Sequence, residues 1–265
     1  MMRPMPPTSF KPKKSLGQNF LMHARIADRI AKAAGLTKDS VVFEIGPGTG
    51  MLTRALLKLA GKVIALEADG ELFERLQCDF ASEIASGRLE LIYGDIRAFD
   101  TSTLPRGYVL AANIPYYLTG EIVRMFLEAR HQPSSMTILV QKEVAERIAR
   151  STKESILSLS VKAYGTPKLE FTVPRGAFVP APKVDSAVLT IGDISRRHFS
   201  SPEEEGRFFA LVRAGFAHKR KYVQKNLSEV GLTAQAFVPE KARAEDLPLS
   251  AWLALSRNGV SPSAS

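Results

Sequence analysis

The chain contains a single cysteine, Cys78, among its 265 residues. One cysteine excludes an internal disulfide and a zinc site built from several thiolates. Four scattered histidines complete no metal-ligand spacing, so we expect no bound metal. No apolar run approaches the roughly 20 residues of a membrane span, and residues 1–7 show no signal-type hydrophobic stretch. We therefore expect a cytoplasmic protein that has no membrane partner, and nothing in the residues suggests anything other than a monomer.

Acidic residues are the minority among the charges: 27 Asp and Glu stand against 36 Lys and Arg, which gives a net charge of +9. This excess favours a polyanionic partner, although a generally basic surface explains the total equally well. Clustering favours nucleic acid. The residues expected to contact RNA form one group near the N-terminus and another late in the chain: Lys11, Lys13, Lys14, Lys219, Arg220, Lys221 and Lys225.

Short apolar runs alternate with amphipathic segments through the first two thirds of the chain. The runs predict strands at 41–45, 63–66, 89–93, 108–112 and 136–140, and the segments predict helices at 23–34, 51–59, 71–85, 120–128 and 142–150. Such alternation is typical of an α/β fold with a parallel sheet covered on both faces. Two further strands, near 169–173 and 187–191, follow without a long helix between them and suit an antiparallel hairpin at one sheet edge.

Composition divides the chain into four parts. Residues 1–22 form a basic N-terminal arm, 23–195 the α/β domain, 196–258 a small helical domain and 259–265 a disordered tail. The helical domain opens with Ser201 as a helix cap, followed by Pro202 and the acidic residues 203–205 in the first turn. No strand pattern follows it.

The first strand runs directly into Gly46-Pro47-Gly48-Thr49-Gly50. A glycine-rich turn between a strand and a helix lets a ligand approach the backbone closely. The dinucleotide fingerprint places its third glycine one residue later, where this chain has Met51. The spacing therefore disfavours a pyrophosphate and suits a nucleoside that carries an amino-acid tail.

Acidic residues close the next two strands. Glu67 ends the second strand, where this architecture places a carboxylate that accepts from both ribose hydroxyls. Asp95 follows the third strand and could accept from an adenine amino group. Either acid alone is most simply a solvated loop residue, but together they point to a nucleoside site.

The fourth strand ends in Asn113-Ile114-Pro115-Tyr116. The exocyclic nitrogen of adenine is a poor nucleophile, because its lone pair is delocalised into the ring. The side-chain oxygen of Asn113 and the carbonyl of Ile114, held extended by the following proline, can accept its two N–H bonds. Tyr116 offers a ring on which a flipped base can stack, which contributes about 1–3 kcal/mol.

These motifs resemble the ribosomal RNA adenine dimethyltransferase family, and within it the branch that acts on small-subunit (16S) RNA. The resemblance rests on 15–21, 44–50, 94–95, 113–116, 178–188 and 243–247, and covers about residues 11–257. It implies a class I (Rossmann-like) domain that uses S-adenosylmethionine, yields S-adenosylhomocysteine and needs no metal. It also implies N6,N6-dimethylation of two adjacent adenosines in the 3′-terminal hairpin loop of 16S RNA, within the small ribosomal subunit or its precursor.

The resemblance further implies roles for individual residues. Asn19 and Leu21 would contact the amino-acid end of the cofactor, near Gly46 and Gly48. Glu67 would bind the ribose, Asp95 the cofactor adenine, and Asn113 both cofactor and target. Phe178 would be the second stacking ring, opposite Tyr116; without the resemblance, a core aromatic is equally consistent with the residues.

Two segments depart from the family pattern. Ile156-Leu157-Ser158 replaces a Tyr-Gly-Arg, and His218 to Tyr222 keeps the basic character of its segment but not the Gln and Thr hydrogen-bonding positions. Two alternatives also remain: a large-subunit (23S) RNA methyltransferase of the macrolide-resistance type, and a non-catalytic RNA-binding assembly factor with the same fold. The segment 183–187 and the stretch 243–255 favour the small-subunit enzyme, and the complete set of site residues favours catalysis.

Overall fold

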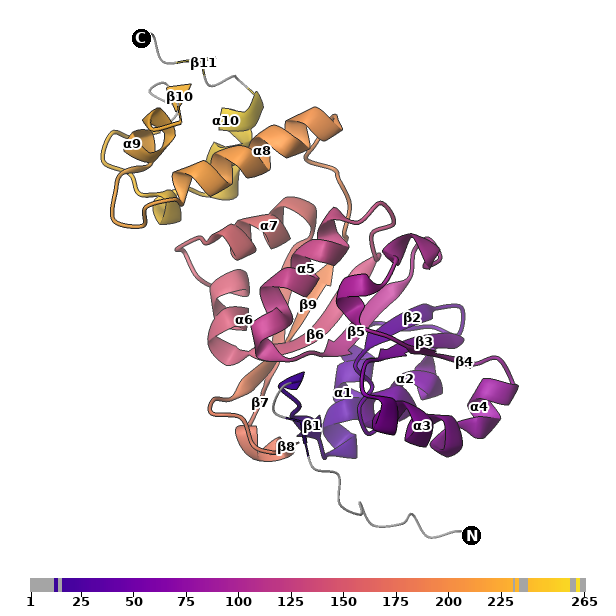
Figure 1. Ribbon diagram of the computed structural model, residues 1–265. Helices are drawn as coiled ribbons and strands as arrows, with labels where there is room; N and C mark the ends of the chain where they lie inside the picture. Colours follow the sequence, from indigo (N-terminus) through magenta and orange to yellow (C-terminus); the bar gives the residue numbers. More distant parts are fainter. Residues whose placement is uncertain (1–11, 14–15, 231, 234–237, 258–260, 263–265) are drawn as a thin grey trace.

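The protein consists of a central sheet with helices on both faces, and a smaller helical part packed beside it, as the computed structural model in Figure 1 shows. The structure describes residues 12–13, 16–230, 232–233, 238–257 and 261–262. None of the helices within these ranges is long and apolar enough to cross a membrane.

Seven strands form the central sheet in the order β4-β3-β2-β5-β6-β9-β7. Neighbours among the first five are parallel, while β9 runs antiparallel to both β6 and β7. The predicted α/β class, the parallel strands and the antiparallel edge pair are thus confirmed. The strands are β2 (Val41–Ile45), β3 (Lys62–Glu67), β4 (Leu89–Tyr93), β5 (Val109–Asn113), β6 (Ser135–Gln141), β7 (Thr166–Val173) and β9 (Ser186–Gly192).

Alternate side chains of each strand enter two separate cores. Val42 of β2 packs with apolar residues of the helices on one face, and Phe43 packs with those on the other. The first face carries α1 (Ala24–Ala33), α2 (Met51–Leu59) and α3 (Gly70–Asp79), which is followed by the short α4 (Ala81–Ala85). The second face carries α5 (Thr119–Glu128), α6 (Lys142–Ala149) and α7 (Ile156–Tyr164) (Figure 1).

The single helix predicted over 71–85 is instead two helices, and the break lies at Phe80. Its backbone leaves the helical region (φ −119°, ψ 24°), and its ring is buried against the start of α2. A side chain at Gly50 would come within 2.5 Å of that ring. Packing of the ring therefore outweighs the helical propensity of the surrounding residues.

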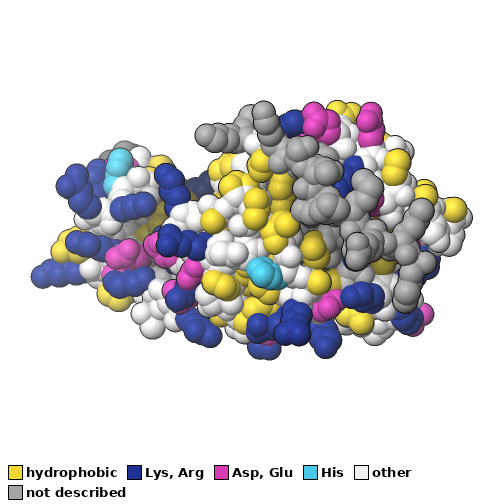
Figure 2. Space-filling view, turned by 90° about the horizontal axis from the view of Figure 1, so that it is seen from below, with side chains coloured by type: hydrophobic (Ala, Val, Ile, Leu, Met, Phe, Trp, Pro, Cys, Tyr) yellow, Lys and Arg dark blue, Asp and Glu magenta, His cyan; other side chains and the backbone are white. Residues whose placement is uncertain are grey.

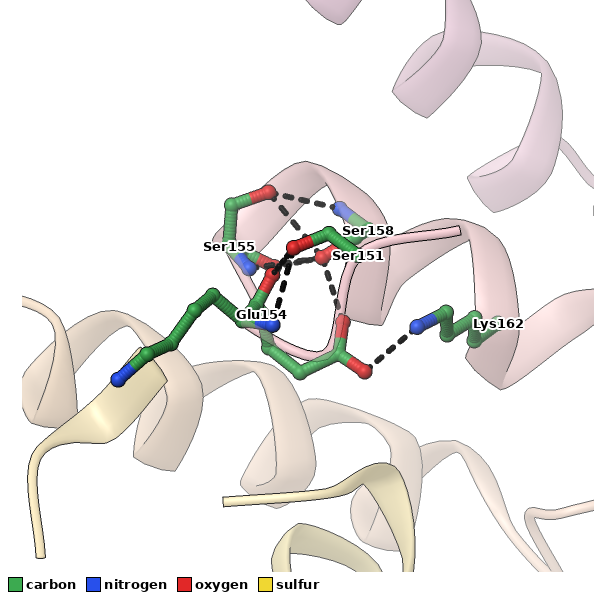
Figure 3. A network of polar contacts seen from close by, with 6 residues as sticks. Ser151, Glu154, Ser155, Ser158 and Lys162 are labelled. Atoms are coloured by element: carbon green, nitrogen blue, oxygen red, sulfur yellow. Dashed lines mark hydrogen bonds and ion pairs between the residues drawn. The ribbon is translucent and has the colours of Figure 1, made fainter. Parts of the chain in front are cut away.

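Helix α7 was not predicted, because it is buried on most sides and so lacks an amphipathic period. A capping box starts it: Ser155 Oγ accepts from the Ser158 amide (3.1 Å), and Ser158 Oγ accepts from the Ser155 amide (2.7 Å). Glu154 accepts from Ser158 Oγ and from Lys162 Nζ, each at 2.6 Å (Figure 3). The departure at 156–158 thus opens a well-capped helix.

The described residues of the C-terminal part include the α-helices α8 (Pro202–Gly215), α9 (Val223–Ser228) and α10 (Leu249–Arg257). The predicted cap is present, because the Ser201 side chain accepts from the Glu204 amide. Phe208 and Trp252 belong to the same core as Leu159 of α7. Because the core is continuous, a domain boundary near residue 195 stays a prediction.

One short pairing lies where the sequence showed no strand. β10 (Leu232–Thr233) pairs antiparallel with β11 (Ser261–Pro262). Residues 261–262 belong to the predicted tail 259–265, whose other residues lie outside the described ones, so its disorder stays a prediction. Two-residue strands are too short to leave a periodic sequence signal.

Candidate active site

A cavity opens at the carboxyl ends of β2, β3, β4 and β5, where the strand order reverses direction. Open α/β sheets bind ligands at this position, because the connecting loops diverge there. The structure brings together nearly all the residues predicted from the sequence to form the cofactor and base sites. Those lining the cavity are Asn19, Leu21, Gly46, Gly48, Glu67, Asp95, Asn113, Ile114 and Tyr116.

The glycine turn after β2 adopts a backbone that disfavours other residues. Gly46, Gly48 and Gly50 have φ values of 65°, 59° and 74°. A side chain at Gly48 would press on the Phe20 ring at 3.1 Å, whereas the space beside Gly46 is open. A ligand can therefore lie against the backbone at Gly46.

Glu67 is fixed at the end of β3 by two backbone amides. Its Oε2 accepts from Gly48 and its Oε1 from Asp69, both at 2.9 Å. Burial raises the pKa of this carboxyl, and the two amide bonds oppose that rise. Each oxygen keeps a second lone pair, so the carboxylate can still accept from a pair of hydroxyls.

Glu44 is the most deeply buried acid of the site, and the sequence had assigned it no role. It lines the cavity with 1% of its surface exposed, and its Oε2 has no hydrogen-bond partner among the described residues. Burial, together with the nearby negative charge of Glu67, raises its pKa to about 8. An unpaired buried carboxyl fits a ligand that carries hydrogen-bond donors, such as an α-amino group.

Asp95 lies at the exposed rim of the cavity, directly after β4. Its Oδ1 accepts from the Arg97 amide at 2.9 Å and thereby caps the short 3-10 helix Ile96–Ala98. The capping bond fixes the carboxylate at the rim and leaves its other oxygen for a donor on a ligand.

Asn113, at the end of β5, is hydrogen-bonded to the N-terminal segment, residues 16–21. Its Nδ2 donates to the Asn19 carbonyl at 3.1 Å, which turns Oδ1 into the remaining acceptor. This orientation is the one that acceptance of an adenine N–H requires. Ile114 is 2% exposed and also lines the cavity.

Tyr116 and Tyr117 begin the 3-10 helix Tyr116–Leu118. Tyr116 is half-buried, and its hydroxyl shares a 2.6 Å hydrogen bond with Ser186 Oγ of β9. Burial raises the pKa of the Tyr116 phenol, although the bond to Ser186 opposes this. Tyr117 is more open, with 59% of its surface exposed.

Phe178 is not among the residues that line this cavity, and its stacking position opposite Tyr116 stays a prediction. It lies in the two-residue strand β8 (Phe178–Val179), which pairs with β1 (Phe20–Leu21). Its ring is 3% exposed and packs in the same core as Leu21 and Val188. Burial of an aromatic ring next to an exposed Pro-rich loop is the stronger local preference here.

The N-terminal basic cluster is only partly within the described residues, because Lys11 and Lys14 lie outside them. Lys13 forms an ion pair with Asp69, with 2.7 Å between Nζ and Oδ1. It is therefore held at the rim of the cavity, and while the pair persists it is not available to a phosphate.

The second basic cluster lies in the turn between α8 and α9 and at the start of α9. Lys219, Arg220 and Lys225 are exposed, while Lys221 pairs with Glu229 at 2.5 Å. Figure 2 shows Lys and Arg side chains gathered over the smaller lobe and along one rim of the larger lobe. The cluster thus presents positive charge on the helical part.

The sheet order and the cavity at its reversal point define a Rossmann-like methyltransferase domain with a nucleoside-sized site. The family model "Ribosomal RNA adenine dimethylase" matches residues 9–257. The chain therefore belongs to the ribosomal RNA adenine dimethylase family, and it is a methyltransferase.

Curated relatives agree with this family. The chain is 38% identical over 257 residues to "Ribosomal RNA small subunit methyltransferase A" of Dehalococcoides mccartyi, covering 92% of this chain and 87% of that one. It is also 38% identical to the protein of the same name from Deinococcus radiodurans, covering 93% and 85%.

Solved structures share the fold. The 23S rRNA methyltransferase ErmE is 26% identical with a TM-score of 0.73, covering 89% of this chain and 97% of that one. A dimethyladenosine transferase from Plasmodium falciparum is 26% identical with a TM-score of 0.73, covering 88% and 94%.

Proposed function

We propose that the protein transfers methyl groups from S-adenosylmethionine to N6 of two adjacent adenosines in the 3′-terminal hairpin loop of 16S rRNA. The relatives named for the small-subunit enzyme support this substrate over others. The partner would be the small ribosomal subunit or its precursor, and we place the protein in the cytoplasm as a monomer.

The lining of the cavity supports the choice of cofactor. Glu67 would accept from the ribose hydroxyls, Asp95 from the adenine amine, and the open backbone at Gly46 would face the amino-acid end, with Asn19 and Leu21 beside it. Bound there, the cofactor would supply the methyl group of its sulfonium, and S-adenosylhomocysteine would remain as the product.

The observation that carries the proposal is the orientation of Asn113. Its Nδ2 is committed to Asn19, so Oδ1 remains to accept one N–H of the target amine, and the Ile114 carbonyl would accept the other. Both bonds hold the nitrogen lone pair toward the methyl carbon. The bound cofactor would supply the methyl group, with a C–N bond forming as the S–C bond breaks, and the methylated amine would then lose its proton to water. Alignment supplies most of the acceleration.

Tyr116 would stack on the extruded base. A single ring provides about 1–3 kcal/mol, which is comparable to the few kcal/mol that extrusion of a base costs. An unpaired loop adenine would need less than that, and this favours a hairpin loop over a duplex.

The direct test is an Asn113→Ala variant, assayed with labelled cofactor on isolated small subunits that lack the modification. Removal of one hydrogen-bonding group that stabilises the transition state costs roughly 10²–10³-fold in rate. We expect a loss of this size, with the fold unchanged by circular dichroism. Undiminished label transfer would overturn the catalytic role of Asn113. No label transfer by the unmodified protein would instead favour a non-catalytic RNA-binding assembly factor.

A second candidate function is methylation of 23S rRNA, favoured by the structural likeness to ErmE. Labelled methyl transfer to isolated large and small subunits, compared side by side, separates the two. Incorporation into the large subunit alone would reject the 16S proposal.

A further inference from the structure

Asp69 has more hydrogen-bond donors around it than a helix cap requires. It follows β3 and caps α3, with Oδ1 accepting from the Glu71 amide at 3.1 Å. Oδ1 also accepts from Lys13 Nζ at 2.7 Å, and Oδ2 accepts from Gln18 Nε2 at 2.9 Å. Its side chain is only 3% exposed, whereas the Lys13 side chain that pairs with it is 40% exposed.

The two extra donors come from the N-terminal segment that lines the cofactor cavity. Residues 16–21 all contribute to that lining. Gln18 is held twice, because its Oε1 also accepts from the Lys13 amide at 2.7 Å. Farther along, the Asn19 carbonyl accepts from Asn113. Asp69 is thus the anchor of this segment on the β3 side of the cavity.

Asp69 also contacts the part of the site assigned to the cofactor ribose. Its own amide donates to Oε1 of Glu67, the carboxylate assigned to the cofactor ribose. One residue therefore contacts both the ribose carboxylate and the segment expected at the amino-acid end of the cofactor. These two groups are far apart in sequence, and residues 67–69 are their covalent and hydrogen-bonded link.

We propose that Asp69 is a positioning residue that holds the N-terminal segment against the cofactor site, so that its bonds to Lys13 and Gln18 slow the release of the cofactor. The inference rests on the proposed function, because it concerns the same cavity. Burial raises the pKa of Asp69, but the bonds from Lys13 and Gln18 outweigh it and lower the pKa below its ordinary value. The residue therefore stays charged at neutral pH and binds both donors.

Asp69→Asn is the informative substitution. Asparagine caps a helix as well as aspartate does, so α3 keeps its first turn. It loses the charge that binds Lys13 and has one acceptor oxygen where the carboxylate has two. Asp79→Asn is the matched control, since Asp79 ends the same helix and pairs with Arg54 outside the cavity lining.

The experiment measures the affinity and dissociation rate of tritiated S-adenosylmethionine with the full-length protein. For Asp69→Asn we expect about tenfold weaker binding, mostly through faster dissociation, and no change for Asp79→Asn. Gln18→Leu and Lys13→Met should each reproduce part of the effect. Combined with Asp69→Asn, Lys13→Met should add nothing, because both changes remove the same ion pair, whereas Gln18→Leu also removes the bond from the Lys13 amide.

Salt distinguishes this role from a merely structural one. Lys13 is 40% exposed, so its ion pair is screened by added salt. The dissociation rate of the unmodified protein should rise between 50 and 500 mM KCl, and that of Lys13→Met should rise less. Thermal unfolding without cofactor should be the same for all variants within a few degrees.

Two results would overturn the inference: binding by Asp69→Asn within twofold of the unmodified protein, or a loss in Asp69→Asn that Lys13→Met and Gln18→Leu do not share. Either can occur in a protein that binds the cofactor and methylates RNA, and then only the role of Asp69 fails. An unmodified protein that does not bind S-adenosylmethionine would instead reject the proposed function itself.

Discussion

The Tyr116 hydroxyl and Ser186 Oγ lie 2.6 Å apart, and this contact joins the loop after β5 to the antiparallel strands at one side of the sheet. Tyr116 follows β5, whereas Ser186 begins β9 and is fully buried. The ring of Tyr116, in the loop after β5, is therefore held in place by a residue of β9. The bond fixes the tilt of a ring that would otherwise turn freely about its side-chain bonds.

We predict that Ser186→Ala lowers methyl transfer about five- to tenfold, consistent with the 0.5–1.5 kcal/mol that a typical hydrogen bond contributes. Tyr116→Phe should lower it to a similar extent, and the double variant no further, because both changes remove one bond. Stacking on fluorescent 2-aminopurine RNA is the second readout. Additive losses in the double variant would show that Ser186 acts by another route.

The roles of the Tyr116 and Phe178 rings can be compared by replacing each residue with leucine. Tyr116→Leu removes a ring from the cavity lining, so we expect at least a tenfold loss of methyl transfer. Phe178→Leu changes a core residue to another apolar one, so we expect near-normal transfer with some loss of stability. Equal losses of base stacking in both variants would mean that Phe178 reaches the base once RNA is bound.

Glu44 makes the stability of the protein depend on pH. Its pKa is about 8 in the folded state and 4.5 for an exposed glutamate. The folded state therefore holds the proton more tightly, so the contribution to stability is full below about pH 4.5 and is lost as pH rises through 8. We expect the unmodified protein to lose on the order of a few kcal/mol relative to Glu44→Gln between pH 5 and 9. Urea unfolding measures this, and parallel curves for the two proteins would contradict it.

The basic turn after α8 is expected to contact phosphates. Neutralising Lys219, Arg220 and Lys221 should weaken RNA binding and flatten its salt dependence, without changing the affinity for S-adenosylmethionine. A matched control neutralises Lys32, Lys38 and Arg106, which are exposed near the amino ends of the parallel strands, opposite the cavity. Unchanged RNA affinity in the first triple variant would reject this surface.

For elements with a strong hydrophobic period, the predicted bounds lie within one or two residues of the observed ones. Strand β4 and helix α2 have the expected bounds, because each has one buried face or a continuous apolar run between turn residues. Helix α7 was not predicted, because neighbouring elements bury it on most sides. The helix break at Phe80 was not predicted either, because it depends on a contact of the Phe80 ring with the turn at Gly50. Neither cause is visible in local sequence.

The candidate site was predictable where function depends on strand ends. Glu67, Asp95 and Asn113 follow successive parallel strands, and the architecture alone brings them together. Asp69 was missed, although its place two residues after Glu67 and before Gly70 is a helix-cap signal. The contact of Ser186 with Tyr116 could not be predicted, because it depends on how the edge strands pack, whereas burial of Phe178 was an alternative that the residues alone left open.

The loop before α7 ties the sheet to the helical part. The Glu154 amide donates to the Glu245 carbonyl at 2.7 Å, and Lys153 forms ion pairs with Glu245 and Asp246. Helix α7 contributes to a core that also contains Phe208 and Trp252. Unfolding of either part would therefore expose apolar residues of the other to water. Damage to α8 or α10, remote from the methyl-transfer chemistry, is therefore expected to reduce the amount of folded enzyme in the cell and leave the turnover of each surviving molecule intact.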